Sequence, residues 1–322
     1  MSNGVFVSNG SEHAPKVQYL VVKEDSEGQR IDNFLLSRLK GVPKSWIYRV
    51  LRRGEVRVNK GRVKPTRRLA LGDRVRIPPI RTASENQAKP GEGLRQLIDD
   101  SVLFEDEQLL VVNKPSGVAV HGGSGVSHGV IEVMRDLRPE ASYLELAHRL
   151  DRDTSGCLML AKKRSALQQL QKLQLAGKVE KRYLALLTGR WKKGRVTVDV
   201  PLQKNTLKSG ERVVRVDPKG KAAITHFEVL QRFEDSMLVE ARLETGRTHQ
   251  IRVHAQHQGS PIAGDPKYAS DEQNQMLRHL GLNRLFLHAW RLSFPWEGRK
   301  GGYRFEAPLP QELQLVLDRL KK

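Results

Sequence analysis

The sequence predicts an α+β protein, with a small α/β domain followed by a larger domain built on a mixed, mostly antiparallel β-sheet with peripheral helices. Its 322 residues are enough for two domains of unequal size. The first quarter of the chain combines two helical patterns with short strands and is dense in Lys and Arg. The remainder is rich in strand patterns but lacks regular strand–helix alternation, which excludes a doubly wound parallel sheet.

The charge of the chain indicates a polyanionic partner. The sequence holds 56 Lys and Arg against 36 Asp and Glu, a net charge of +20. Fifteen basic and three acidic residues lie between Arg30 and Ile80, so this short segment carries +12 of the excess. Nucleic acid is favoured over a membrane surface, because no basic helix has a clean apolar face.

Three further observations predict a cytoplasmic protein without a membrane segment. The N-terminus lacks the basic and apolar regions of a secretory signal. No apolar run approaches the roughly 20 residues that a membrane span needs. The single cysteine, Cys157, cannot form an internal disulfide.

We expect a polar, disordered tail over residues 1–17 and a folded domain over residues 18–80. A strand at 18–23 is followed by a helix at 30–39 and a second helix at 46–53, capped by Ser45 and ended by Gly54. Short strands then turn at 59–61 and begin again near residue 71. The outer face of the second helix presents the candidate RNA-binding residues Lys44, Arg49, Arg52 and Arg53.

Residues 81–98 are rich in Pro, Gly and polar residues and are predicted to be a flexible linker. The larger domain, 99–322, opens with two strands and a Pro-Ser-Gly loop. A helix capped by Ser165 and ending at Gly177, several further strands and a closing helix at 310–322 follow.

The candidate catalytic segment is His148-Arg-Leu-Asp-Arg-Asp-Thr-Ser-Gly156, which places two carboxylates, two guanidiniums and an imidazole within nine residues. The apolar run Cys157–Ala161 comes directly after it and is typical of a buried strand. A polar loop joined to a buried strand holds a reactive side chain in a fixed place.

This string resembles the signature of the RluA-type RNA pseudouridine synthases, and Asn113–Gly117 resembles a second segment of that family. The segments Val56–Asn59 and Leu71–Val75, with the two helices before them, resemble the S4 RNA-binding domain over about residues 18–80. The resemblance implies a pseudouridine synthase fold preceded by an S4 domain.

The family resemblance also implies the roles of particular residues. Asp151 corresponds to the catalytic carboxylate. Tyr183 corresponds to the active-site tyrosine beside the target base. Arg252, in the string Leu243–His254, corresponds to the arginine that pairs with the catalytic Asp.

Two further arginines are implied to contact RNA. Arg149 corresponds to a residue that holds the RNA after the target base has left its helix, and Arg247 is expected to contact phosphate or shape the turn. The family segments Gly264–Tyr268 and Leu285–His288 are interpreted as scaffold.

The reaction itself limits the chemistry required. Converting uridine to pseudouridine breaks a C–N glycosidic bond and joins the ribose to carbon 5 of the same base, so it needs no cofactor or metal. It needs a carboxylate that attacks the sugar, attacks the base or removes a proton at the 2′ carbon, three alternatives that the sequence leaves open. The target base must first leave the RNA helix.

Competing motifs are absent from the sequence. His254 and His257 are three residues apart without a carboxylate at metal-binding spacing, and Asp151 and Asp153 lie among arginines that disfavour Mg²⁺. Ser155 lacks the Gly-x-Ser-x-Gly context of esterases.

Three segments resemble most the family branch that modifies uridines in 23S ribosomal RNA: His121–Val126, Leu207–Val216 and Leu282–His288. We therefore expect a monomeric enzyme that acts on large-subunit RNA, free or in an assembling particle, and requires no protein partner. Two alternatives remain: a non-catalytic S4-type RNA-binding or ribosome-assembly factor, and an RNA glycosidase or nuclease.

Overall fold

The computed structural model describes residues 17–39, 42–80, 89–123, 126–206 and 212–321. The chain divides into two compact units between residues 88 and 89. Residues 1–16 of the predicted tail lie outside the described residues. Residues 81–88 of the predicted linker and residues 207–211 also lie outside them.

The first unit is a four-stranded sheet covered by two helices. Its strands run in the order β1-β4-β2-β3, and every neighbouring pair is antiparallel. Alternate strand residues and one face of each helix form a single core around Phe34, Ile47 and Val75. The elements are β1 Gln18–Val21, the 3₁₀ helix η1 Glu24–Ser26, α1 Ile31–Arg38, α2 Lys44–Arg53, β2 Arg57–Val58, β3 Gly61–Arg62 and β4 Arg74–Ile77.

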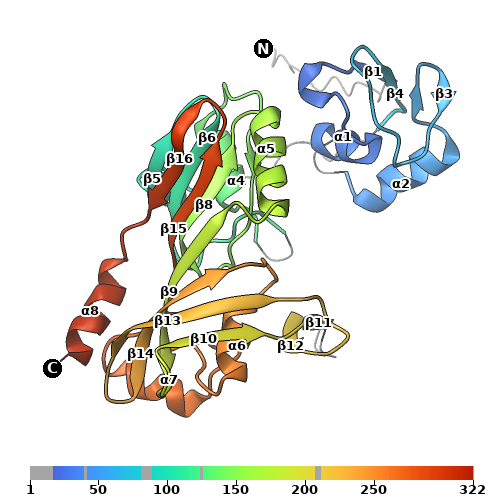
Figure 1. Ribbon diagram of the computed structural model, residues 1–322. Helices are drawn as coiled ribbons and strands as arrows, with labels where there is room; N and C mark the ends of the chain where they lie inside the picture. The colour runs from blue at the N-terminus through green and yellow to red at the C-terminus, as the bar shows by residue number, and fades with distance from the viewer. Residues whose placement is uncertain (1–16, 40–41, 81–88, 124–125, 207–211, 322) are drawn as a thin grey trace, which may run out of the picture. The chain divides into compact units, whose positions relative to one another are not determined.

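The second unit is organised around a ten-stranded sheet (Figure 1). Its strands are β5 Val102–Glu105, β6 Leu109–Lys114, β7 Glu145–Leu146, β8 Ser155–Ala161, β9 Glu180–Thr188, β10 Arg195–Asp199, β13 Ile224–Arg232, β14 Ser236–Leu243, β15 Leu287–Trp296 and β16 Arg299–Glu306. Eight of them run in the order β10-β13-β14-β9-β15-β8-β6-β5, with β16 beside β15 and β7 beside β8. The pair β8–β15 is parallel and the other pairs are antiparallel, which confirms the predicted mixed, mostly antiparallel sheet.

Helices cover both faces of this sheet, and a separate hairpin lies beside it. The helices are α3 Glu92–Asp99, α4 Val130–Leu137, α5 Arg164–Leu175, α6 Gln250–His257, α7 Asp271–Arg278 and α8 Gln311–Leu320; the hairpin is β11 Leu202–Thr206 with β12 Arg212–Val216. In β8, Leu158 and Leu160 join the core beneath α3, α4 and α6, whereas Cys157 and Met159 join the core beneath α5. The apolar run of β8 is therefore continuous because both of its faces are buried.

The prediction of a flexible linker over residues 81–98 is wrong for its second half, which contains a helix. Residues 92–99 form α3, which belongs to the second unit. Ile98 is fully buried, and Arg95 pairs with Asp136 of α4, Nε to Oδ2 at 3.0 Å. Pro90 and Gly91 precede the helix, whereas Gly93 lies in its first turn. Contacts with α4 stabilise this segment, which has few apolar residues of its own.

Two predicted helix caps also differ from the structure. α2 begins one residue before Ser45, after Pro43, and α5 begins at Arg164 before Ser165. The prediction that Gly54 ends α2 is confirmed, because this residue adopts the left-handed conformation with φ 72°.

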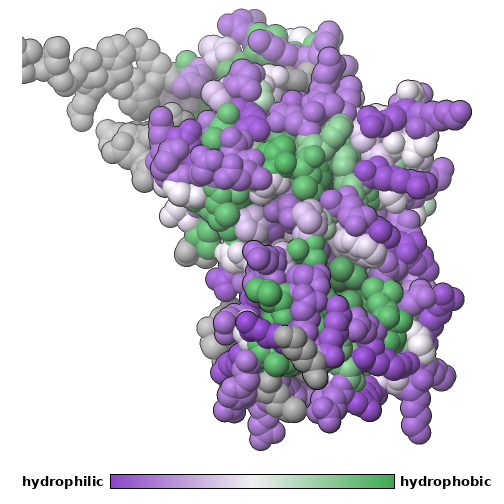
Figure 2. All heavy atoms as spheres, turned by 90° about the vertical axis from the view of Figure 1, so that its left-hand side faces the viewer, coloured by the Kyte–Doolittle hydropathy of each residue, from purple (hydrophilic) through white to green (hydrophobic). Residues whose placement is uncertain are grey.

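The surface in Figure 2 is mostly hydrophilic, with smaller groups of hydrophobic side chains between the polar ones. No described helix is long and apolar enough to cross a membrane.

Candidate active site

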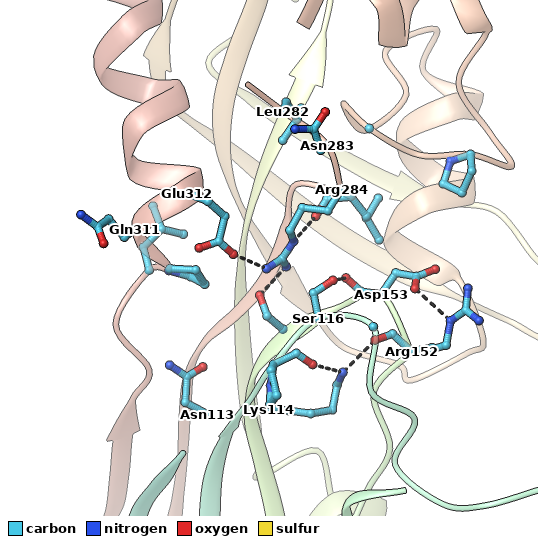
Figure 3. Close-up of a pocket in the computed structure, with 18 of the residues that line it drawn as sticks. Asn113, Lys114, Ser116, Arg152, Asp153, Leu282, Asn283, Arg284, Gln311 and Glu312 are labelled. Carbon is cyan, nitrogen blue, oxygen red and sulfur yellow. Dashed lines mark hydrogen bonds and ion pairs between the residues drawn. The ribbon is translucent and has the colours of Figure 1, made fainter. Parts of the chain in front are cut away.

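The loop between β7 and β8 carries Asp151 and is fixed at both ends. At its start, Nε2 of His148 accepts the backbone N–H of Met159 at 3.1 Å. In its middle, Nζ of Lys114 and the N–H of Gly117 donate to the carbonyl of Arg152 at 2.8 and 2.9 Å. The Ser116 hydroxyl donates to the carbonyl of Asp153 at 2.8 Å (Figure 3). The Asn-Lys-Pro-Ser-Gly segment therefore anchors the backbone beside Asp151.

Lys114 is fully buried and contributes all its polar contacts to the backbone. Its ammonium group donates to the carbonyls of Pro115, Val118 and Arg152 at 2.7 to 2.8 Å. Burial, assisted by Arg284, lowers the pKa of Lys114 to about 7. Three carbonyl acceptors favour the ammonium form, because a neutral amine has only two N–H groups to donate.

The end of the loop is held by a chain of hydrogen bonds across the sheet. Nη2 of Arg284 donates to the Ser155 hydroxyl at 2.6 Å, and that hydroxyl lies 2.9 Å from Nδ1 of His288. Nε2 of His288 lies 3.1 Å from the carbonyl of Ala307 and donates to it. Gly156 follows with φ 110°, and a Cβ there would collide with the carbonyl of Ala289 on β15. β8 and β15 can approach closely at this point only because residue 156 is a glycine.

The side chain of Asp151 is partly exposed, at 20%. A guanidinium and an imidazole face one oxygen of its carboxylate. Nη1 of Arg252 lies 3.6 Å from Oδ2, and Nε2 of His249 lies 3.8 Å from the same atom. No hydrogen bond from another described residue reaches either oxygen of this carboxylate. The predicted meeting of Asp151 and Arg252, which are a hundred residues apart in the chain, is therefore confirmed as a contact.

Arg252 is oriented by a second carboxylate. Its Nε and Nη2 donate to Oδ2 and Oδ1 of Asp265, both at 2.7 Å, and both side chains are almost completely buried. Burial alone lowers the pKa of Arg252, but the hydrogen bonds and charge of Asp265, together with the charge of Asp151, raise it above its ordinary value. The guanidinium therefore stays charged, with two nitrogens on Asp265 and the third toward Asp151.

Tyr183 lies on β9 with its side chain on the same sheet face as α6. Its ring belongs to the core that contains Ile251 and Ala255 of α6, and its residue exposure is 7%. Burial, then the negative charge of Asp151, raise the pKa of the Tyr183 hydroxyl above its ordinary value. The phenol is therefore protonated at neutral pH.

Two residues interpreted as scaffold belong to this site. Asp265 fixes Arg252, and the Tyr268 hydroxyl lies 2.8 Å from Nδ1 of His249 while accepting the N–H of Val214 at 3.0 Å. His249, in the same string as Arg252, was not predicted as a site residue. The available signal was the presence of Asp and Tyr in Gly264–Tyr268, but sequence spacing alone does not place that turn beside α6.

The remaining predicted residues make no hydrogen bond or ion pair with this carboxylate. Arg149 is exposed and lines a cavity of about 440 Å³ with His121, Arg135 and His148. Arg247 is exposed, and its Nε donates to the carbonyl of Ala222 at 3.0 Å. In the first unit, the predicted α2 residues are all exposed: Lys44, Arg49, Arg52 and Arg53.

A larger cavity of about 1120 Å³ lies against the anchored loop, as Figure 3 shows. Its lining includes Lys114, Asp153 and Arg284, but Asp151, Tyr183 and Arg252 do not line it. Two charged groups in its lining, Arg284 and Glu312, pair with each other, Nη1 to Oε1 at 3.0 Å. This cavity is therefore not the place where a substrate meets Asp151. Among the described residues, no group of His, Cys, Asp and Glu is arranged to hold a metal ion.

Comparison with known proteins identifies the class. Residues 108–257 match the family model described as RNA pseudouridylate synthase, and residues 29–75 match the S4 domain. Among solved structures, Human RNA Pseudouridylate Synthase Domain Containing 4 superposes with a TM-score of 0.59 at 29% identity, covering 71% of this chain and 96% of that one. The chain belongs to the RNA pseudouridylate synthase family and carries an S4 domain.

Several relatives that match this chain over nearly its full length share one name. Ribosomal large subunit pseudouridine synthase C of Yersinia pestis is 54% identical over 310 residues, which cover 96% of this chain and 97% of that protein. The proteins of the same name from Haemophilus influenzae and Escherichia coli K12 are each 51% identical, covering 95% of this chain and 96% and 98% of their own lengths.

Proposed function

We propose that this protein isomerises specific uridines to pseudouridine in 23S ribosomal RNA, with Asp151 as the catalytic carboxylate. The name shared by its relatives supports the choice of large-subunit RNA. The observation that carries the catalytic assignment is the approach of Arg252 Nη1 to Asp151 Oδ2, at 3.6 Å, in a loop whose backbone is fixed. A ribosomal RNA substrate agrees with the cytoplasmic location that the sequence predicts.

The residues around Asp151 have distinct tasks in this proposal. Asp151 acts on the ribose or the base of a uridine that has left its helix. Arg252 keeps the carboxylate ionised and oriented, because a nearby guanidinium favours the charged form. Tyr183, protonated and against the site, contacts the extruded base and donates from its hydroxyl. The reaction transfers no electrons and no external group, so these side chains suffice without a cofactor.

RNA binding is divided between the two units. The exposed α2 residues Lys44, Arg49, Arg52 and Arg53 contact phosphates of structured RNA, which supplies affinity without reading sequence. Arg149 occupies the space that the target base leaves, and Arg247 contacts phosphate near the catalytic loop.

The experiment compares Asp151→Asn with Asp153→Asn on a 23S ribosomal RNA transcript. Asp151→Asn keeps the side-chain shape but removes its charge and nucleophilicity, so modification should cease while RNA affinity stays within about a few-fold. Asp153→Asn is the matched control, because Asp153 lies in the same loop but pairs with Arg152, Oδ1 to Nε at 3.0 Å. Pseudouridine is mapped chemically, and RNA mass is measured in parallel.

Three results would overturn the proposal. Turnover by purified Asp151→Asn would remove the catalytic assignment. A wild-type enzyme that releases uracil or cleaves RNA would be a glycosidase or nuclease, since isomerisation leaves mass and length unchanged. Tight binding of the transcript and of pre-ribosomal particles without any modification would favour the ribosome-assembly factor.

A further inference from the structure

The sheet of the first unit carries a row of arginines on its outer face. The strand register places Tyr19, Arg76, Arg57 and Arg62 opposite one another across all four strands, and Arg74 opposite Val21 in the next row. The alternating residues Val58, Val75 and Ile77 are buried in the core. Because side chains alternate along a strand, the arginines must point to the opposite face. We call Tyr19, Arg57, Arg62, Arg74 and Arg76 the sheet face.

The arginines of the sheet face have no carboxylate partner among the described residues. Three of them donate to consecutive backbone carbonyls at the C-terminal end of α2: Arg62 to Arg53 at 3.3 Å, Arg57 to Gly54 at 3.3 Å and Arg76 to Glu55 at 2.7 Å. The guanidinium of Arg74 lies over the ring of Tyr19, 4.3 Å from its centroid. Like charges directly opposite each other on neighbouring strands destabilise a sheet, so this row costs stability unless an anion neutralises it.

The exposed tyrosine distinguishes the kind of anion. Tyr19 is 52% exposed, and Val21 beside it is 60% exposed. A free phosphate needs only the guanidiniums, whereas RNA presents phosphates at intervals together with sugars and bases that pack against an aromatic ring. The combination of guanidiniums in a row and an exposed ring at its end therefore fits an RNA strand better than a small anion.

We propose that the sheet face is a second RNA-binding surface, which holds the phosphate backbone along Arg62, Arg57 and Arg76 and places a base or sugar against Tyr19. This inference rests on the proposed function, because the same ribosomal RNA is the ligand. It adds to the predicted α2 surface a set of contacts that comes from strands and not from a helix.

The test removes two charges from the sheet face with Arg57→Gln/Arg76→Gln and measures affinity for the 23S transcript between low and moderate salt. Each lost phosphate contact should reduce the slope of log affinity against log salt by about 0.7–0.9. Affinity should fall at least about tenfold at low salt. The melting temperature should change little, because the relief of self-repulsion offsets the loss of the hydrogen bonds to the Gly54 and Glu55 carbonyls. Tyr19→Leu should weaken binding without changing the slope.

The control Lys23→Gln/Lys64→Gln removes the same charge from two exposed lysines outside the sheet face. An equal loss of slope in this control would mean that only net charge matters, and the proposal would fail. It would also fail if Arg57→Gln/Arg76→Gln keeps its slope, or binds weakly only because it melts early. Modification of the transcript by the wild-type protein, measured in the same assay, tests the proposed function separately from the sheet face. A wild-type protein that binds RNA through the sheet face but does not modify it would refute the proposed function alone.

A separate observation concerns His249, whose backbone is in the left-handed region with φ 53° and ψ 20°. The other described non-glycine residues with positive φ, Asn59 and Lys60, form a turn between two strands. His249 instead precedes α6 and faces Asp151. Such a conformation is costly for a residue with a side chain and concentrates at functional sites.

The hydrogen bonds around His249 favour one position for its proton. The Tyr268 hydroxyl accepts the N–H of Val214 and can donate its own hydrogen to Nδ1 of His249. In that tautomer Nε2 carries the proton of the neutral ring, and Nε2 is the atom that faces Oδ2 of Asp151. Burial lowers the pKa of His249; the charges of Asp151 and Asp265 oppose this effect, and those of Arg252 and Lys267 assist it.

We infer that His249 is a positioning residue for Asp151. Its Nε2–H and the Nη1 of Arg252 converge on Oδ2, which leaves Oδ1 to act on the substrate. The distances of 3.8 and 3.6 Å are longer than hydrogen bonds. We expect them to shorten in the complex with RNA, as catalytic contacts commonly do. This role also rests on the proposed function, and Tyr268 supports it by favouring this tautomer.

The test uses His249→Gly, which removes the imidazole while permitting the left-handed backbone, and His249→Gln, which returns an N–H donor. We expect His249→Gly to lower kcat by about 10–100-fold with KM for RNA within a few-fold, and His249→Gln to recover part of the loss. Tyr268→Phe should lower kcat less. An unchanged kcat in His249→Gly would refute the role. A fall in kcat that His249→Gln does not recover, and that accompanies a lower melting temperature, would also refute it. An inactive wild type would instead refute the proposed function.

Discussion

Arg252 is held by Asp265 through two hydrogen bonds of 2.7 Å, and this pair determines where its third nitrogen lies. Asp265 is fully buried and also accepts the backbone N–H groups of Lys267 and Tyr268. The carboxylate is therefore fixed by its own turn before it contacts the arginine. Arg252 in turn has Nη1 directed toward Asp151, so the cation that faces the candidate catalytic group is placed by a turn more than a hundred residues further along the chain.

Arg252→Met should abolish most activity and destabilise the second unit. It leaves Asp265 as an unpaired buried carboxylate, and breaking a buried ion pair by removing one partner typically costs about 3–5 kcal/mol. Denaturant unfolding and single-turnover modification measure the two effects. A variant that keeps most of its activity would refute the role of Arg252 as the counter-charge of Asp151.

Asp265→Asn should lower activity while Asp151 and Arg252 are both intact. The amide cannot accept two hydrogen bonds from the guanidinium in the same geometry, because one of its two heavy atoms is a donor. Arg252 then loses its fixed orientation, and we expect kcat to fall by at least about tenfold at saturating RNA. Asp271→Asn, at the exposed start of α7, is the control for a lost acid nearby. Full activity in Asp265→Asn would show that Asp151 alone orients Arg252.

His288→Gln should make the protein less sensitive to acid, although it is less stable at neutral pH. Burial, then the charge of Arg284, lower the pKa of His288 from 6.5 in the unfolded chain to about 4. Between these values the unfolded chain binds a proton that the folded protein does not, so this residue reduces stability as pH falls from 6.5 to 4. The effect reaches at most roughly 3 kcal/mol.

The measurement is the free energy of unfolding of both proteins at pH 7.5, 6, 5 and 4.5. The gap between wild type and His288→Gln should narrow steadily below pH 6.5, because all other histidines are common to both. A constant gap across this range would mean that His288 is not kept neutral by its burial between Ser155 and Ala307.

Deleting residues 1–80 should weaken RNA binding and slow modification without removing the chemistry. The deleted piece holds 17 basic and 7 acidic residues, a net charge of +10. It contributes no residue to the cores of the second unit, so the remainder should fold. The salt slope of binding should become shallower, and raised enzyme concentration should restore conversion.

Two outcomes would contradict that expectation. An unchanged salt slope would mean that the first unit does not touch RNA. A folded but completely inactive truncation would mean that this unit helps to build the active site in addition to binding RNA.

Several features of this protein could be predicted from local sequence alone. The two-residue period of strands and the 3.6-residue period of helices are visible in the chain, so β8, β9, α2 and α8 were expected close to where they lie. The excess of basic residues before Ile80 indicated RNA. The string around Asp151 and the string containing Arg252 resembled one family, and from that resemblance their contact could be predicted.

Other features depend on tertiary structure. α3 has few apolar residues and becomes a helix because Ile98 and Arg95 find partners in the second unit. The sheet face exists because antiparallel register aligns residues from four strands, which no single segment contains.

In the candidate active site, too, some features follow from the sequence and others from the tertiary structure. Sequence determined which residue types are available near Asp151, because chemistry is carried by identity and short spacing. The order of the strands decided that Asp265, Tyr268 and His249 meet there, because the sheet brings segments distant in the chain together. Hydrogen bonds of 2.7 Å then select one orientation for Arg252, and the Tyr268 hydroxyl, 2.8 Å from Nδ1, holds the ring of His249. Such short-range, directional forces act only after the backbone has placed their atoms, so sequence spacing alone does not determine them.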